Sequence, residues 1–201
     1  PVHSKRFFNA VFDVQSFDAA VSSSLLNNTK HIEIPAGYYA NPYNCGSVTN
    51  KLDVVVLGAL EIDTDFNVNV ITGSEGNIRG ASGGHSDTAA GAHMTVVVCP
   101  SFRGRIPIIK KKINNVVTPG ETVDVVVTER GICINPLRQD LLDQFKDSVL
   151  PIKTIEELEE EVRGICGEAQ HVEYTDKIVA LVEYRDGTVI DVIKQLAISN
   201  E

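Results

Sequence analysis

The stretch with the clearest chemical potential is residues 76–92, which read GNIRGASGGHSDTAAGA. It contains a glycine-rich turn, the pair Gly83-Gly84, and then small residues that favour a helix. Glycine lets a backbone approach a ligand closely and adopts positive φ at no steric cost. Ser86 and Asp87 are candidate caps for a helix that begins right after the loop, where unpaired N–H groups carry a partial positive charge.

Such a loop suits a phosphate, a carboxylate or a thioester oxyanion, because each accepts hydrogen bonds from backbone amides. The alternative is a tight loop between buried elements, in which Gly83 and Gly84 only provide room. His85 stands between the glycine pair and the helix start, and it is either a packed or capping residue or a catalytic one. Ser86 lacks the strand–turn–helix pattern of a hydrolase nucleophile.

Two further groups of polar residues follow apolar, strand-like runs. Glu61, Asp63 and Asp65 come at a strand end, where carboxylates can act as base or nucleophile, or hold a polar substrate. The alternative is that they cap the sheet edge and stay solvated. Arg103 and Arg105 lie in a later loop and can pair with carboxylates in a bidentate manner.

The composition narrows the class of protein. Hydrophobic residues make up 43% of the 201 positions, enough for one good core. The net charge of −9 argues against a nucleic-acid partner, and an anionic ligand would need local donors and cations. The four cysteines show no metal-ligand spacing, so we expect no metal site, and Cys99 and Cys133 are expected as small core hydrophobes. No signal peptide or membrane-spanning run is visible, and we expect a cytoplasmic protein that does not bind a membrane.

Apolar runs rich in β-branched residues predict strands buried on both faces, as in parallel sheets covered by helices. Residues 108–117 contain the basic run 110–112, which we interpret as part of a solvated edge strand. Residues 38–50 show no periodicity and are expected to form a loop. The expected strands are residues 11–14, 31–34, 52–63, 66–71, 94–99, 108–117, 123–127 and 132–134.

Helical patterns separate these strands. Thr154 and Glu157 have the spacing of a capping box, and Gly167 is expected to end that helix. Asp186-Gly187 between two alternating runs predicts a C-terminal β-hairpin. The alternation indicates an α/β domain with a mainly parallel sheet, in which ligands bind beyond the carboxyl ends of strands. The expected helices are residues 17–26 with Ser16 as N-cap and Phe17 on the apolar face, the segment ending at 92, 137–147, and 155–166.

Several of these segments together carry a family resemblance. VLGALEID (56–63), GGHSDTAAGA (83–92) and VTERGICINP (127–136) resemble, in order and spacing, the α-chain family of bacterial citrate lyases. Residues 182–191 resemble that family's C-terminus, and residues 12–18 resemble the opening of its second half. The likeness spans nearly the whole chain, and a looser one extends to other CoA-transferases.

The resemblance implies a three-layer α/β/α sandwich of the CoA-transferase type. Residues 1–201 would form a single CoA-transferase-like domain, the C-terminal one of two in a longer chain. The implied enzyme is a citrate CoA-transferase, which moves the acyl-carrier thioester from acetate to citrate and gives citryl-carrier plus acetate. No cofactor would be bound permanently; the thioester carrier is CoA or the phosphoribosyl-dephospho-CoA group of the acyl carrier (γ) subunit.

The implied complex also contains a lyase (β) subunit, which cleaves the citryl thioester, and the α chain is expected to self-associate. The glutamate motif of covalent CoA-transferases is not visible, which agrees with direct exchange through a mixed anhydride. The resemblance assigns oxyanion or thioester contacts to the loop amides, a pocket boundary to Glu61 and substrate contacts to the remaining candidates. The candidate catalytic residues are Gly83, Gly84 and Glu61, and the candidate substrate- or CoA-binding residues are Asn67, Gly80, His85, Ser86, Asp87, Arg103 and Arg105.

Three alternatives stay open from the sequence. The chain could be a non-catalytic scaffold or docking domain of the same complex. It could act on citramalate in place of citrate. A sugar-phosphate isomerase of the same broad fold would need a lysine and carboxylates arranged as proton shuttles, and that pattern is not seen near the glycine pair.

Overall fold

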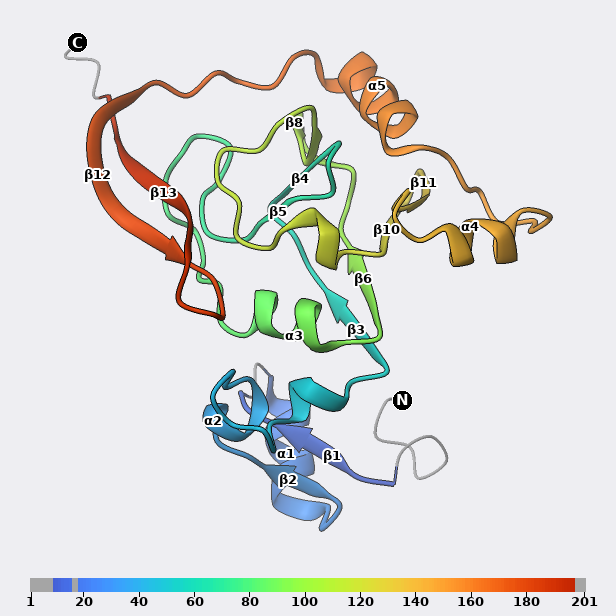
Figure 1. Cartoon of the computed structure of the whole chain (residues 1–201), viewed down its shortest axis with the longest axis vertical. Coiled ribbons are helices and arrows are strands. Elements are labelled where there is room, and N and C mark those ends of the chain that lie inside the picture. The colour runs from blue at the N-terminus through green and yellow to red at the C-terminus, as the bar shows by residue number, and fades with distance from the viewer. Residues whose placement is uncertain (1–8, 16–17, 198–201) are drawn as a thin grey trace. The chain divides into compact units, whose positions relative to one another are not determined.

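The computed structural model describes residues 9–15 and 18–197, and these fall into two compact units that meet in the sequence between Asn50 and Lys51. Figure 1 labels their helices and strands. Across the part of the chain described, every helix is too short or too polar to cross a bilayer.

The first unit contains a small parallel pair of strands. β1 (Val11–Asp13) pairs with β2 (His31–Glu33), and α1 (Ala19–Asn27) connects them. Asp18 caps α1, because its side chain accepts a hydrogen bond of 2.8 Å from the Val21 amide. The expected N-cap was Ser16, which lies outside the described residues together with Phe17. The cap is therefore two residues later than predicted.

The expected loop 38–50 is only partly irregular. It overlaps a short helix, α2 (Ala36–Tyr39), and a 3₁₀ turn, η1 (Val48–Lys51). The helix begins directly after Pro35, which sits at the N-cap. Its single turn carries too little periodicity to be recognised in a sequence.

A four-stranded sheet forms the centre of the second unit, in the order β11-β10-β6-β3. β3 (Val54–Leu57), β6 (Met94–Val98) and β10 (Val125–Thr128) are parallel, and β11 (Gly131–Ile134) is antiparallel. One face, which includes the fully buried Val97, belongs to the core. The other face stays partly open, with its exposed valines at 46–66% accessibility. These are Val54, Val56 and Val98. Burial on both faces was predicted and is found on one.

The single strand expected over 52–63 is two strands in different sheets. After β3 the chain leaves the sheet at Gly58 and continues as β4 (Glu61–Asp63). β4 lies between β5 (Val68–Asn69) and β9 (Ile109–Lys110). The strand expected over 108–117 is reduced to β9, because the chain then turns away from the sheet.

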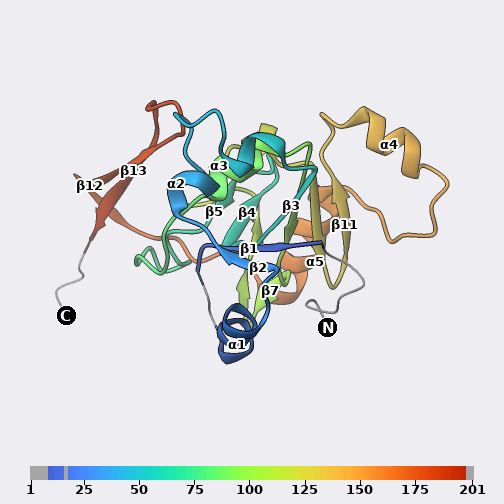
Figure 2. The same cartoon turned by 90° about the horizontal axis from the view of Figure 1, so that it is seen from below.

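Two predicted features of the C-terminal part are confirmed. α5 (Ile155–Cys166) begins with the Thr154 capping box, both of whose hydrogen bonds are present, and it ends at Gly167 with φ +83°. β12 (Tyr174–Glu183) and β13 (Val189–Leu196) form the antiparallel hairpin. The hairpin and β11 lie at opposite ends of this unit (Figures 1 and 2).

The remaining elements are short. α4 (Gln139–Phe145) confirms the helix expected over 137–147. β7 (Phe102–Arg103) and β8 (Ile106–Pro107) form a small hairpin in the predicted arginine loop. η2 (Gly120–Thr122) is a 3₁₀ turn before β10. The chain is thus an α/β protein with mixed sheets, and in its central sheet β3, β6 and β10 are parallel while β11 is antiparallel.

Candidate functional site

The glycine loop leads into α3 (His85–Gly91), as predicted. Gly83 has φ +50°, and a Cβ at this position would meet open space. Among the described residues, the amide nitrogens of Gly83 and Gly84 make no hydrogen bond. Gly84 is the N-cap of α3 and no side chain caps it, so the expectation of a cap by Ser86 or Asp87 was wrong. The loop therefore presents two backbone donors that the fold itself does not use.

His85 fixes this loop to its surroundings. Its Nε2 lies 2.9 Å from the carbonyl oxygen of Gly58, and its Nδ1 lies 2.7 Å from Oγ1 of Thr118. A carbonyl can only accept, so Nε2 carries the hydrogen and Nδ1 accepts from the threonine hydroxyl. Burial lowers the pKa of His85, which keeps the ring neutral. The ring thus ties the loop to the chain just after β3, and both of its nitrogens are engaged. Ser86, the next residue, is buried.

Asp87, in the first turn of α3, forms an ion pair with Arg185 in the turn between β12 and β13. Its Oδ1 lies 3.6 Å from Nε of Arg185, and the two side chains are 15% and 20% exposed. Burial raises the pKa of Asp87, and the charge of Arg185 opposes this shift. Oδ1 is buried and makes no hydrogen bond within the described residues. An arginine therefore lies beside the same end of α3 as the free amides.

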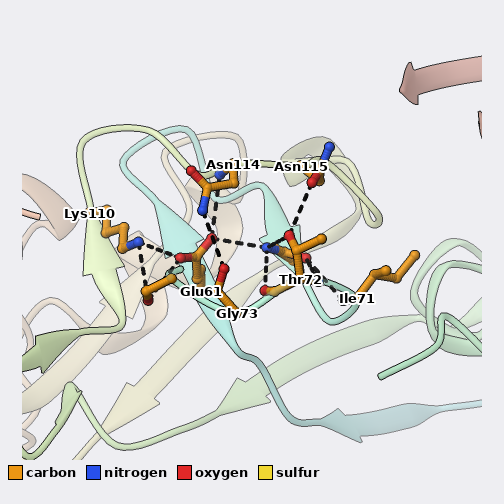
Figure 3. Close-up of polar contacts among 9 residues, drawn as sticks. Glu61, Ile71, Thr72, Gly73, Lys110, Asn114 and Asn115 are labelled. Carbon is orange, nitrogen blue, oxygen red and sulfur yellow. Dashed lines mark hydrogen bonds and ion pairs between the residues drawn. The ribbon is translucent and has the colours of Figure 1, made fainter. Parts of the chain in front are cut away.

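Glu61, a candidate catalytic residue, is fully buried and lies in a closed polar network (Figure 3). Its Oε1 accepts hydrogen bonds from Nζ of Lys110 and from Oγ of Ser74. Its Oε2 accepts a hydrogen bond of 2.9 Å from Nδ2 of Asn69. Because these donors surround the carboxylate, it has no face toward solvent. The solvated edge predicted for the basic run holds for the exposed Lys111 and Lys112 but not for Lys110, which is 4% exposed.

Asn67, a candidate substrate-binding residue, is engaged in a structural turn. Its Nδ2 donates to Oδ2 of Asp63 over 3.2 Å, and its Oδ1 accepts from the amide of Gly120 over 2.9 Å. Burial raises the pKa of Asp63, and the hydrogen bonds from Asn67 oppose this shift. Of the three carboxylates expected at this strand end, Glu61 and Asp63 are buried, at 0% and 2% exposure, whereas Asp65 is exposed as the solvated alternative predicted.

Of the two predicted arginines, Arg103 borders a cavity of about 250 Å³ and Arg105 does not. Ser74 in the cavity wall connects it to the buried carboxylate of Glu61. Gly80 allows a close backbone approach, since a Cβ there would lie 2.5 Å from the carbonyl oxygen of Val70. The cavity is lined by Leu60, Gly73, Ser74, Glu75, Arg79, Arg103, Ile106 and Ile108.

Comparison with known proteins identifies the family to which this chain belongs. The sequence model for citrate lyase, alpha subunit (CitF), matches residues 1–196. The chain belongs to the citrate lyase α-subunit family. The citrate lyase α chain of Klebsiella pneumoniae is 51% identical over 195 residues, which cover 97% of this chain and 38% of that protein. The corresponding chain of Escherichia coli K12 is 48% identical with the same coverage.

A crystal structure from the same family shows the fold. The α subunit of citrate lyase from Streptococcus mutans, in complex with citrate, is 56% identical, with a TM-score of 0.89. The match covers 94% of this chain and 37% of that one. The chain thus spans less than two fifths of the length of the citrate lyase α chains that it matches.

The structure brings together only some of the candidate residues. Gly83 and Gly84 precede α3, and His85 and Asp87 lie in its first turn, while Glu61 and Asn67 belong to buried networks and Arg103 to a separate cavity. Sequence reasoning missed Arg185, because the segment around Asp186-Gly187 was interpreted as a hairpin turn only. Tyr184 precedes it, and burial raises the pKa of its phenol. The sequence signal that could have identified it was an arginine within residues 182–191, a segment that already resembled the family.

Proposed function

We propose that this chain is part of a citrate CoA-transferase, the α subunit of citrate lyase. In this proposal the enzyme exchanges the thioester of an acyl carrier from acetate to citrate. The observation that carries the proposal is the pair of unused amides at Gly83 and Gly84, on a turn that His85 holds in place. The family of the chain supports the assignment, since its relatives are α chains of citrate lyase.

The chemistry follows from the donors. A citrate carboxylate attacks the carbonyl carbon of the acetyl thioester, forming a mixed anhydride and releasing the carrier thiolate. The thiolate then attacks the citryl carbonyl of the anhydride and acetate leaves. Each attack places negative charge on a carbonyl oxygen, and the amides of Gly83 and Gly84 donate hydrogen bonds to it. His85 positions these amides, and no acid–base step is assigned to it, because both ring nitrogens are bonded.

The wider setting is part of the same proposal. The thioester substrate is CoA or the phosphoribosyl-dephospho-CoA group of the γ subunit, and the β subunit consumes the citryl product. The α chain self-associates in the cytoplasm. The exposed turn at Gly83, with open space where a Cβ would stand, fits an extended thioester arm. We further propose that the matched region belongs to a CoA-transferase α/β/α sandwich.

The test uses the full-length α chain with its partner subunits. Label transfer from citrate to the acyl carrier is measured for the wild type and for Gly84→Val, which places a branched side chain beside the amides. We expect kcat to fall by about 10²–10³-fold, the loss typical of an oxyanion donor. The matched control is Gly164→Val, which adds the same side chain in open space on α5 and leaves turnover unchanged.

The contrary result is also informative. Normal turnover in Gly84→Val, with thermal stability unchanged, would remove the oxyanion role from this loop. The scaffold alternative would then be favoured, and it has a structural basis, since Glu61 and Asn67 already serve the fold. Repeating the assay with citramalate decides between the two acceptors.

A further inference from the structure

We propose that Arg185 binds a non-reacting carboxylate of the acceptor and thereby selects polycarboxylates over simple carboxylic acids. This inference rests on the proposed function and concerns the same loop. It starts from the ion pair of Arg185 with Asp87, in which Nε lies 3.6 Å from Oδ1. At this distance the two charged groups form an ion pair, but the N···O separation is longer than that of an N–H···O hydrogen bond.

The guanidinium of Arg185 therefore keeps its hydrogen-bonding capacity. Arginine carries five N–H donors, and among the described residues no hydrogen bond from Arg185 is formed. Arg138 shows the contrast, because it donates to both carboxylate oxygens of Asp140 and forms a 2.7 Å ion pair with Asp124. Arg138 is engaged as a structural cation, whereas Arg185 is anchored on one side only.

Partial burial strengthens the attraction between the guanidinium of Arg185 and a bound anion. The side chain of Arg185 is 20% exposed, so a bound anion would be only partly screened by water. Charge-assisted, bidentate contacts between arginine and carboxylate are among the strong polar interactions of proteins. Arg103 and Arg105, the arginines predicted from the sequence, are both exposed and lack this advantage.

The charge around Arg185 explains why a cation is needed here. Burial is the main cause that raises the pKa of the neighbouring Tyr184; the charge of Arg185 lowers this pKa, and the carboxylates of Glu121, Asp186 and Asp87 add to the rise. The whole chain carries a net charge of −9. A polycarboxylate at the glycine loop would be repelled by these groups unless a positive charge faced it.

The placement fits the reaction. Asp87 lies three residues after Gly84, in the first turn of α3, so its partner Arg185 lies at the same end of this helix as the unused amides. When one carboxylate of the acceptor reacts at the amides, a second carboxylate of the same molecule can reach the guanidinium. Acetate has no second carboxylate, so it gains nothing from Arg185.

The experiment compares acceptors in the full-length α chain with its partner subunits. For Arg185→Gln we expect KM for citrate to rise by about tenfold or more, the loss typical of a hydrogen-bonded charge contact. KM for acetate, measured by label exchange between acetate and the acetyl carrier, stays unchanged. Arg185→Lys retains the charge and restores part of the citrate affinity. Arg138→Gln, the matched control, leaves both KM values at wild-type level.

Two outcomes would overturn the inference. One is an equal rise of KM for citrate and acetate, and the other is a lower melting temperature with unchanged KM values, which would make Arg185 a structural clasp for the hairpin. Calorimetric titration of citrate separates this inference from the proposed function. If wild-type chain binds citrate and Arg185→Gln loses that affinity while no exchange occurs, the transferase assignment fails and the carboxylate contact stands.

Discussion

The buried pair of Glu61 and Lys110 gives the sharpest prediction for stability. Both side chains are at most 4% exposed, and the carboxylate accepts hydrogen bonds on both of its oxygens. Glu61→Gln preserves the shape but turns one acceptor into an NH₂ group. This group must face either the ammonium of Lys110 or the amide of Asn69, and both are donors. The ammonium also loses its countercharge.

The expected cost follows from these two losses. Removing one partner of a buried ion pair destabilises proteins by about 3–5 kcal/mol. For a folded unit of this size each kcal/mol lowers the melting temperature by about 2–4 °C, so we expect a drop of about 6–20 °C. Urea unfolding of the 201-residue chain, followed by circular dichroism, measures the change in free energy. Glu160→Gln is the matched control on the exposed side of α5 and should change stability by less than about 0.5 kcal/mol.

A double-mutant cycle tests whether the pair acts as a unit. Glu61→Met and Lys110→Met each leave one buried charge, while the double variant leaves none. We expect the double variant to be more stable than either single variant, because an apolar pair often replaces a buried ion pair at little cost. A cost below about 1 kcal/mol for Glu61→Gln, or strictly additive effects in the cycle, would refute the reasoning.

Two further predictions concern titratable groups. Burial holds the pKa of His85 below its unfolded value of about 6.5, so its contribution to stability is present above that pH and is lost as the pH falls toward the folded pKa. His85→Asn should therefore reduce the slope of unfolding free energy between about pH 6.5 and pH 5, and an unchanged slope would place the titration elsewhere. Burial raises the pKa of Cys99 and Cys133 to about 12, so both thiols should resist iodoacetamide at pH 8 in the folded chain while the exposed Cys45 reacts. Mass spectrometry of the modified peptides checks this, with urea-unfolded protein as the control; rapid labelling of Cys133 in the native state would contradict it.

The structural features that the sequence predicted best are those set by residues close together in the chain. The Thr154 capping box and the Asp186-Gly187 hairpin depend on residues close together in the chain, and both are present. The strand 52–63 was predicted as one, because its hydrophobicity continues across the position where the chain leaves the sheet at Gly58. Hydrophobic runs identify strands but not which sheet each strand joins.

In the candidate site, too, the features set by neighbouring residues were predicted and those set by tertiary packing were not. The glycine loop and α3 were expected from their residues, and both are found. The partner of Glu61 lies 49 residues away, and Asp87 meets an arginine from the C-terminal hairpin. No periodicity or local motif encodes such pairings, since they arise only when separate elements pack together. Glu61 was therefore assigned to chemistry, although the fold uses it as a buried anion.

The buried pair also constrains how this family can change over evolutionary time. A substitution at Glu61 alone leaves the ammonium of Lys110 buried without a countercharge, and one at Lys110 alone does the same to the carboxylate of Glu61. Either single substitution therefore gives a destabilised protein. Only a coordinated exchange of both positions avoids that loss of stability. Among homologous α chains these two columns should therefore covary, either kept together as acid and base or replaced together by apolar residues.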